Sequence, residues 1–229
     1  MRNLFLTLML LISGAVVTQA QNDGNSFQEN LTAAQNGDVN AMFDLGLQYG
    51  SGDGVGIDQK EAFRWFKKAA QEGHAVAMYN VGARYLNGKG VAIDKKEAFK
   101  WFRKSADRGY DDAMFNLATL FENGVGTDKD TEAAFTWYMG AAFQGNAKAM
   151  FNLGVMYLNG TGVERSDFDA YQWFKQAADS GLPDGMYMVG RMYDSGSGVD
   201  KDKKQARFWY NKAAEHGNKA AAEILFKNH

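Results

Sequence analysis

A unit of 36 residues occurs five times in this chain, with no insertion or deletion to break its register. The unit is easiest to follow in the tryptophans, which stand at Trp65, Trp101, Trp137, Trp173 and Trp209. A methionine, an aromatic residue and two loop glycines keep the same spacing. Self-similarity at a period of 20–50 residues is typical of solenoids and repeat arrays. The five copies run from Asp38 to Gly217 and predict one elongated array in place of a single compact core.

Two stretches of each unit carry apolar residues at helical spacing. In the first copy, Ala41, Leu45 and Tyr49 are four residues apart, and Ala62 and Phe66 repeat that interval. Residues four apart lie on one face of an α-helix. Each unit is therefore predicted to form a helix A, a loop and a helix B, followed by a short glycine turn.

The loop between the two predicted helices is rich in glycine, as in Gly52-Asp53-Gly54-Val55. A Gly-x-Gly pattern can cradle a phosphate, but here no Lys-Ser/Thr follows it and no strand precedes it. We therefore interpret these glycines as turn residues with positive φ. Asp58, followed three residues later by Glu61, has the spacing of a cap at the start of helix B.

Composition excludes several classes of function. Cysteine is absent, so thiol catalysis, disulfides and cysteine metal sites are excluded. The chain has 25 basic and 27 acidic residues, which argues against the clustered cationic face that nucleic-acid binding needs. No catalytic serine, zinc or nucleotide motif is present, and only three histidines occur. We expect no enzyme activity, no catalytic residues, no metal site and no cofactor.

The first twenty residues have the pattern of a secretory signal peptide. Arg2 supplies a positive charge, Leu4–Val17 is mostly apolar, and Ala20 offers a small residue for cleavage. The alternative is an uncleaved anchor, but the run falls short of the roughly 18 apolar residues that a span needs. We expect cleavage after Ala20, no membrane insertion of the mature chain, and a periplasmic location, with secretion as the alternative.

The sequence predicts terminal elements that differ from the repeats. The expected order is a signal peptide (1–20), a tail with a capping helix (21–37), repeats at 38–73, 74–109, 110–145, 146–181 and 182–217, and a final capping helix (218–229). Terminal units of an array must be atypical to remain soluble.

The repeat resembles the Sel1-like repeat family. The resemblance is carried by Ala149–Gly154 with Tyr157, by the loop Gly160–Val163, and by Trp173-Phe174 with the later Gly181. It implies an all-α fold, an αα right-handed superhelical solenoid related to tetratricopeptide arrays, that works as an adaptor surface. The family includes exported bacterial proteins concerned with signalling, envelope assembly and host contact. Some cysteine-rich relatives are associated with β-lactams, and this chain lacks their cysteines.

One aromatic residue of helix A recurs in every repeat and forms the predicted binding ladder. Its members are Phe43, Tyr79, Phe115, Phe151 and Tyr187. By resemblance to tetratricopeptide repeats, this position lies toward the concave groove. Arg191 is one helical turn beyond Tyr187, so we expect a peptide segment whose acidic group reaches Arg191. The alternative is that these rings only pack between adjacent A helices.

The third repeat departs from the others on helix B. Met139 and Phe143 stand where the other repeats have polar or charged residues, and they are four residues apart on one face. An exposed apolar patch marks an interaction site, here predicted on the convex side. The alternative is that Phe143 repacks locally onto a neighbour.

These observations predict an exported, non-enzymatic scaffold that binds a protein or peptide partner and no nucleic acid. We expect the chain itself to be a monomer. One alternative is an immunity or host-interaction protein that binds a single toxin or host molecule. A remoter alternative is a β-lactamase-like hydrolase.

Overall fold

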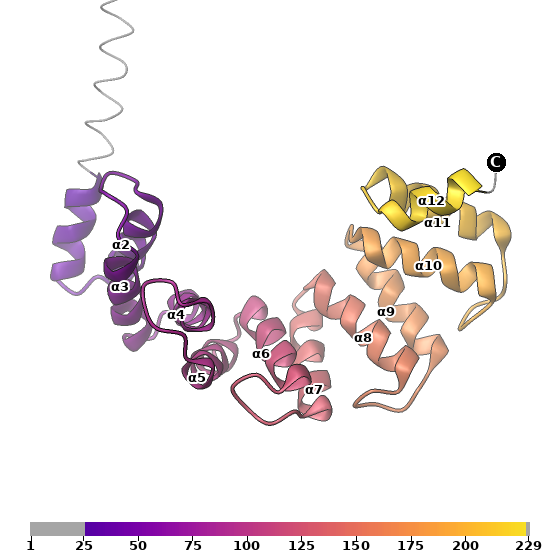
Figure 1. Ribbon diagram of the computed structural model, residues 1–229, viewed down its shortest axis with the longest axis horizontal. Helices are drawn as coiled ribbons and strands as arrows, with labels where there is room; N and C mark the ends of the chain where they lie inside the picture. The colour runs from indigo at the N-terminus through magenta and orange to yellow at the C-terminus, as the bar shows by residue number, and fades with distance from the viewer. Residues whose placement is uncertain (1–25, 228–229) are drawn as a thin grey trace, which may run out of the picture. The chain divides into compact units, whose positions relative to one another are not determined.

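The computed structural model describes residues 26–227, and all regular structure in that range is α-helical (Figure 1). The predicted signal peptide at 1–20, like the rest of the segment before residue 26, lies outside the described residues. The chain divides into two compact units, Met1–Ser105 and Ala106–His229, which are described separately.

The first unit contains the first two repeats. Its elements are a helix over residues 26–35, α2 (Val39–Ser51), α3 (Gln59–Gln71), α4 (Ala75–Asn87) and α5 (Lys95–Ala106). The helix over residues 26–35 lies within the segment 21–37, where the sequence predicts an N-terminal capping helix. Helices α2 and α4 are the A helices, and α3 and α5 are the B helices. Helix α3 packs against both α2 and α4, so it joins the two repeats.

The second unit contains the remaining three repeats. Its elements are α6 (Asp111–Asn123), α7 (Thr131–Phe143), α8 (Ala147–Asn159), α9 (Asp167–Asp179), α10 (Pro183–Ser195), α11 (Lys203–Glu215) and α12 (Lys219–Lys227). Every helix from α6 to α11 packs against the next one in the chain. The predicted all-α class, with repeated pairs of helices A and B, is confirmed.

The loop glycines have the conformation that the turn interpretation requires. Every residue with positive φ in the described range is a glycine. The first loop glycine caps the A helix, as Gly196 does for α10 with φ +80°. The second, such as Gly198, lies against the preceding repeat: a Cβ there would overlap the carbonyl oxygen of Asp167 at the start of α9. The second glycine therefore lets successive repeats approach closely.

Side-chain caps begin many of the helices. Asp58 accepts hydrogen bonds from the backbone N–H groups of Lys60 and Glu61, which satisfies donors that helix α3 leaves unpaired. His74 plays the same part for α4, because its Nδ1 accepts from the N–H of Ala77 at 3.1 Å. These caps set the register in which each helix enters its repeat.

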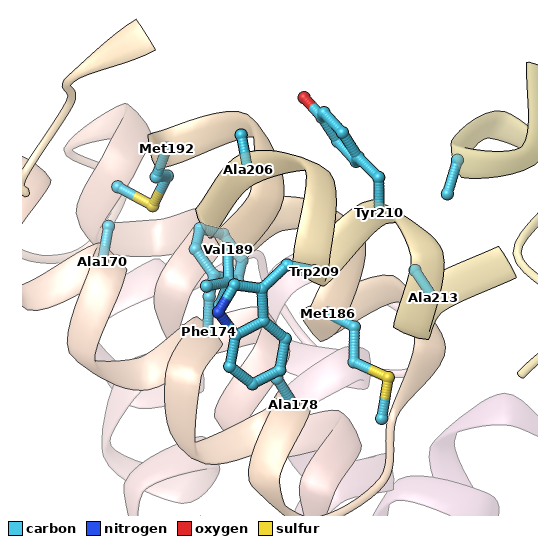
Figure 2. Packing of buried hydrophobic residues seen from close by; sticks show 11 residues of the cluster. Ala170, Phe174, Ala178, Met186, Val189, Met192, Ala206, Trp209, Tyr210 and Ala213 are labelled. Atoms are coloured by element: carbon cyan, nitrogen blue, oxygen red, sulfur yellow. The ribbon is translucent and has the colours of Figure 1, made fainter. Parts of the chain in front are cut away.

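A small residue on helix A lets the B helix of the same repeat come close. A Cβ on Gly154 would lie 2.7 Å from the ring of Phe174, so α8 and α9 need a glycine at this contact. In the last repeat, the Trp209 indole of α11 lies among Phe174 of α9 and Met186 and Val189 of α10 (Figure 2). Trp209 is only 6% exposed, so truncation to alanine is expected to cost about 3–5 kcal/mol.

Candidate binding surfaces

The five rings of the predicted ladder are half-buried on the A helices. Each contacts a ring on the B helix of its own repeat: Phe43 with Phe66, Tyr79 with Phe102, Phe115 with Tyr138, Phe151 with Phe174, and Tyr187 with Tyr210, at centroid distances of 5.4–5.9 Å. These contacts run within a repeat, between its two helices. One side of each ring is therefore structural, and a binding role for the exposed part stays a prediction.

Arg191 lies at a cavity in the second unit. The cavity has a volume of about 300 Å³, and both apolar and polar residues line it: Leu158, Met188, Arg191, Met192, Asp194, Ser195, Ser197 and Tyr210. The Arg191 side chain is exposed, and its guanidinium lies 6.0 Å from the ring centroid of Tyr187. Arg191 forms no ion pair with any residue in the described range. Its positive charge is thus available beside an apolar cavity wall.

A second cavity, of about 350 Å³, is also lined by Tyr210 and Asp194. Asp194, which also lines the first cavity, forms an ion pair with Lys203 at 2.7 Å. Burial raises the pKa of Tyr210 to about 12, and its hydroxyl therefore stays protonated at neutral pH. The two cavities share Tyr210, which contacts Tyr187, the ladder ring nearest the C-terminus.

The third repeat contains a polar network that sequence reasoning missed. Tyr138 of α7 is fully buried, and its hydroxyl donates to Glu122 Oε2 at 2.8 Å and lies 3.1 Å from Thr119 Oγ1. Burial is the main cause that raises the pKa of Tyr138 to about 12. The signal was present in the alignment of the repeats, because phenylalanine occupies the Tyr138 position in three of the other four copies.

Met139 and Phe143, which were predicted to form a patch, differ in exposure. Met139 is half-buried, whereas Phe143 is 75% exposed at the end of α7. The Phe143 ring lies edge-on to Trp173 of α9, with the centroids 6.3 Å apart. This contact still leaves most of the side chain open to solvent. A docking role for the pair stays a prediction.

Within residues 26–227, no group of three or more histidines and carboxylates is arranged to hold a metal ion. No helix in this same range is both long and apolar enough to cross a membrane.

Five segments of the chain match the family model described as Sel1 repeat: residues 39–74, 75–110, 111–142, 147–182 and 183–218. Comparison with curated proteins gave no match.

Two similar solved structures share more than 30% identity with the chain. One is a protective antigen present in uropathogenic Escherichia coli strains, displaying an SLR fold: 35% identity, TM-score 0.83, over 95% of this chain and 50% of that one. The other is a Sel1 repeat protein from Oxalobacter formigenes: 33% identity, TM-score 0.77, over 87% of this chain and 88% of that one. The chain thus spans half the length of the E. coli antigen.

A third similar structure shares the fold alone. It is an immunity protein from Pseudomonas aeruginosa, 22% identical, with a TM-score of 0.51 over 83% of this chain and 73% of that one.

Proposed function

Because the chain belongs to the Sel1 repeat family, we propose that it is an exported, non-enzymatic protein that binds a protein or peptide partner along its A helices. Sel1 repeat proteins generally mediate protein–protein interaction. The likeness to an immunity protein concerns the fold alone, so it does not favour a toxin as the partner.

The observation that carries this proposal is the arrangement around Tyr187 and Arg191. A guanidinium without an ion pair in the described range stands beside an aromatic ring and lines a cavity whose walls are partly apolar. Aromatic and arginine side chains dominate protein-binding hot spots, because they bring large contact area and directed hydrogen bonds. A partner segment with an apolar side chain for the cavity and a carboxylate for Arg191 fits this surface.

Site-specific photo-crosslinking in living cells tests this surface. A crosslinking residue at Ser195, which lines the cavity, should capture a partner, and Arg191→Glu should remove that product. Lys201→Glu is the matched control, since Lys201 is an exposed cation on the following loop. Capture that survives Arg191→Glu, or that fails equally with both variants, would contradict the proposed site.

The ladder needs its own test, because its rings also contact helix B. Replacing Phe115 and Phe151 together with alanine removes two central members, and partner capture is then measured below the melting temperature of the variant. Lost capture with helicity retained would support a binding ladder. A large fall in melting temperature with capture unchanged would show that these rings serve packing alone.

Export and the absence of catalysis are tested on the full chain. We expect the mature protein to begin at Gln21 and to fractionate with the periplasm. An N-terminus at Met1 in the cytoplasmic fraction would contradict export. We also expect no hydrolysis of a chromogenic β-lactam, and turnover by pure protein would revive the hydrolase alternative.

A further inference from the structure

A lysine ammonium covers the indole ring in three of the five repeats. The pairs are Lys68 over Trp65 at 3.8 Å, Lys104 over Trp101 at 4.3 Å and Lys212 over Trp209 at 5.0 Å from the ring centroid. In each pair the lysine follows the tryptophan by three residues, which brings the two side chains together on one helix face. These three tryptophans are 9%, 7% and 6% exposed.

The fourth repeat lacks this cover. Gln176 stands where the three covered repeats have the lysine, just as Gly140 does in the third repeat, and no lysine or arginine of the described chain lies over Trp173. The nearest lysine in sequence, Lys175, bonds Asp179 at 2.6 Å and lies over Trp209 of the next repeat. Trp173 is more exposed than the three covered tryptophans.

The surroundings of Trp173 are also more apolar than those of Trp209. Trp209 receives Lys175 from the preceding B helix, and the residue at that position before Trp173 is Met139 of α7. Phe143, 75% exposed, makes a T-shaped ring contact with Trp173, at a position where the other repeats have charged or polar residues. A half-buried indole without a cation over it and an exposed phenylalanine therefore adjoin on α7 and α9.

We propose that this α7–α9 surface binds a protein partner through a lysine or arginine side chain that lies on Trp173, with an adjoining apolar side chain on Phe143. The chain itself shows what covers this indole position, because a cation occupies it in the three repeats named above. Indole is the ring that binds cations best. The inference adds a second surface to the proposed function and names the chemistry of its occupant.

The test uses a defined probe, so it does not depend on finding the natural partner. Acetyl-Leu-Arg-Leu-amide is titrated into the ¹⁵N-labelled protein while the five indole N–H resonances are followed by NMR. Trp173→Phe assigns the Trp173 signal. We expect this signal to shift and that of Trp209 to stay in place. The citrulline analogue, which has the same shape without the charge, should bind about two- to five-fold more weakly.

A variant of the chain itself supplies the second measurement. Gln176→Lys introduces the lysine that three of the other repeats have at this position, so it should cover Trp173 internally and abolish the response to the arginine peptide. Gln172→Lys, at an exposed position on the same helix, is the matched control and should leave the response intact.

Any of the following results would overturn the inference: equal binding of the arginine and citrulline peptides, no shift of the Trp173 signal, or a response that survives Gln176→Lys. A Trp173 signal that moves when the protein alone is diluted would show that a second copy occupies the surface, which also overturns it. Partner capture at Ser195 does not depend on Trp173, so either surface can fail without the other.

Discussion

Replacing the second loop glycine of the fifth repeat with alanine should weaken the junction between the fourth and fifth repeats. Gly198 has φ +71°, and a Cβ there would lie 2.5 Å from the carbonyl carbon of Asp167 and 3.0 Å from the N atom of Phe168. The atoms in conflict belong to the backbone at the start of α9, so no side-chain rotation relieves the overlap. One of the two repeats must move.

The loss of stability on Gly198→Ala can be estimated by comparison with a glycine that also has positive φ but whose Cβ position overlaps no other atom. Gly181 has φ +88° with no atom within 4 Å of its Cβ position. Gly181→Ala should lower the free energy of unfolding only by the conformational cost of a left-handed residue, about 1–2 kcal/mol. Alanine at Gly198 adds overpacking of about 1–3 kcal/mol, for a total of about 2–5 kcal/mol. The difference between the two variants isolates the inter-repeat contact.

Equilibrium urea unfolding followed by circular dichroism measures both variants against the unmodified protein. Gly198→Ala should have the lower midpoint, and because the loss is confined to one junction of a repeat array, its transition should also broaden. Equal destabilisation by Gly198→Ala and Gly181→Ala would refute the argument that the second glycine exists for the contact with Asp167.

Two further predictions concern pH. Burial lowers the pKa of His74 and outweighs the opposing effect of Asp44, so as pH falls below about 6.5 the unfolded chain takes up the proton first and stability decreases. His74→Asn keeps a side-chain cap without a titrating ring, so urea midpoints at about pH 7.5 and about pH 5 should differ less in this variant; an unchanged difference would exclude His74 as the cause. Tyr138→Phe removes the hydroxyl that donates to Glu122 and should cost about 1–2 kcal/mol at neutral pH; a variant of unchanged stability would show that the network contributes nothing. Burial raises the pKa of Tyr138 to about 12, so the unmodified protein should lose stability as pH rises from about 10 to about 12, and Tyr138→Phe should lose less over that range.

The sequence alone was enough to predict the secondary structure and its repetition. Glycine at positions such as Gly196 indicates a positive φ whatever surrounds it, and an aspartate such as Asp58 caps the helix that begins immediately after it. These features depend on contacts between residues a few positions apart. The period of 36 residues aligns the five copies, so a helix or loop that is hard to assign in one copy can be assigned from the other four.

The candidate sites depended on contacts that the period does not reveal. The sequence placed Phe151 on a helix face, but only the tertiary structure showed its ring against Phe174, 23 positions later in the chain. Arg191 was recognised as a charge near the ladder, whereas the cavity beside it requires Leu158 from the preceding A helix. The hydrogen bonds of the Tyr138 hydroxyl between α6 and α7 likewise became visible only in the tertiary structure.

The physical reason for this division is the range of the interactions. Helix propensity, capping and turn chemistry act within a few residues, so a single repeat carries their full signal. The exposure of a ring such as Phe143, or the open face of Trp173, depends on the side chains that adjoining helices bring within a few ångströms. Those distances depend on how closely two helices approach where a small residue of one faces a large ring of the other. Only the packing of the folded chain determines them.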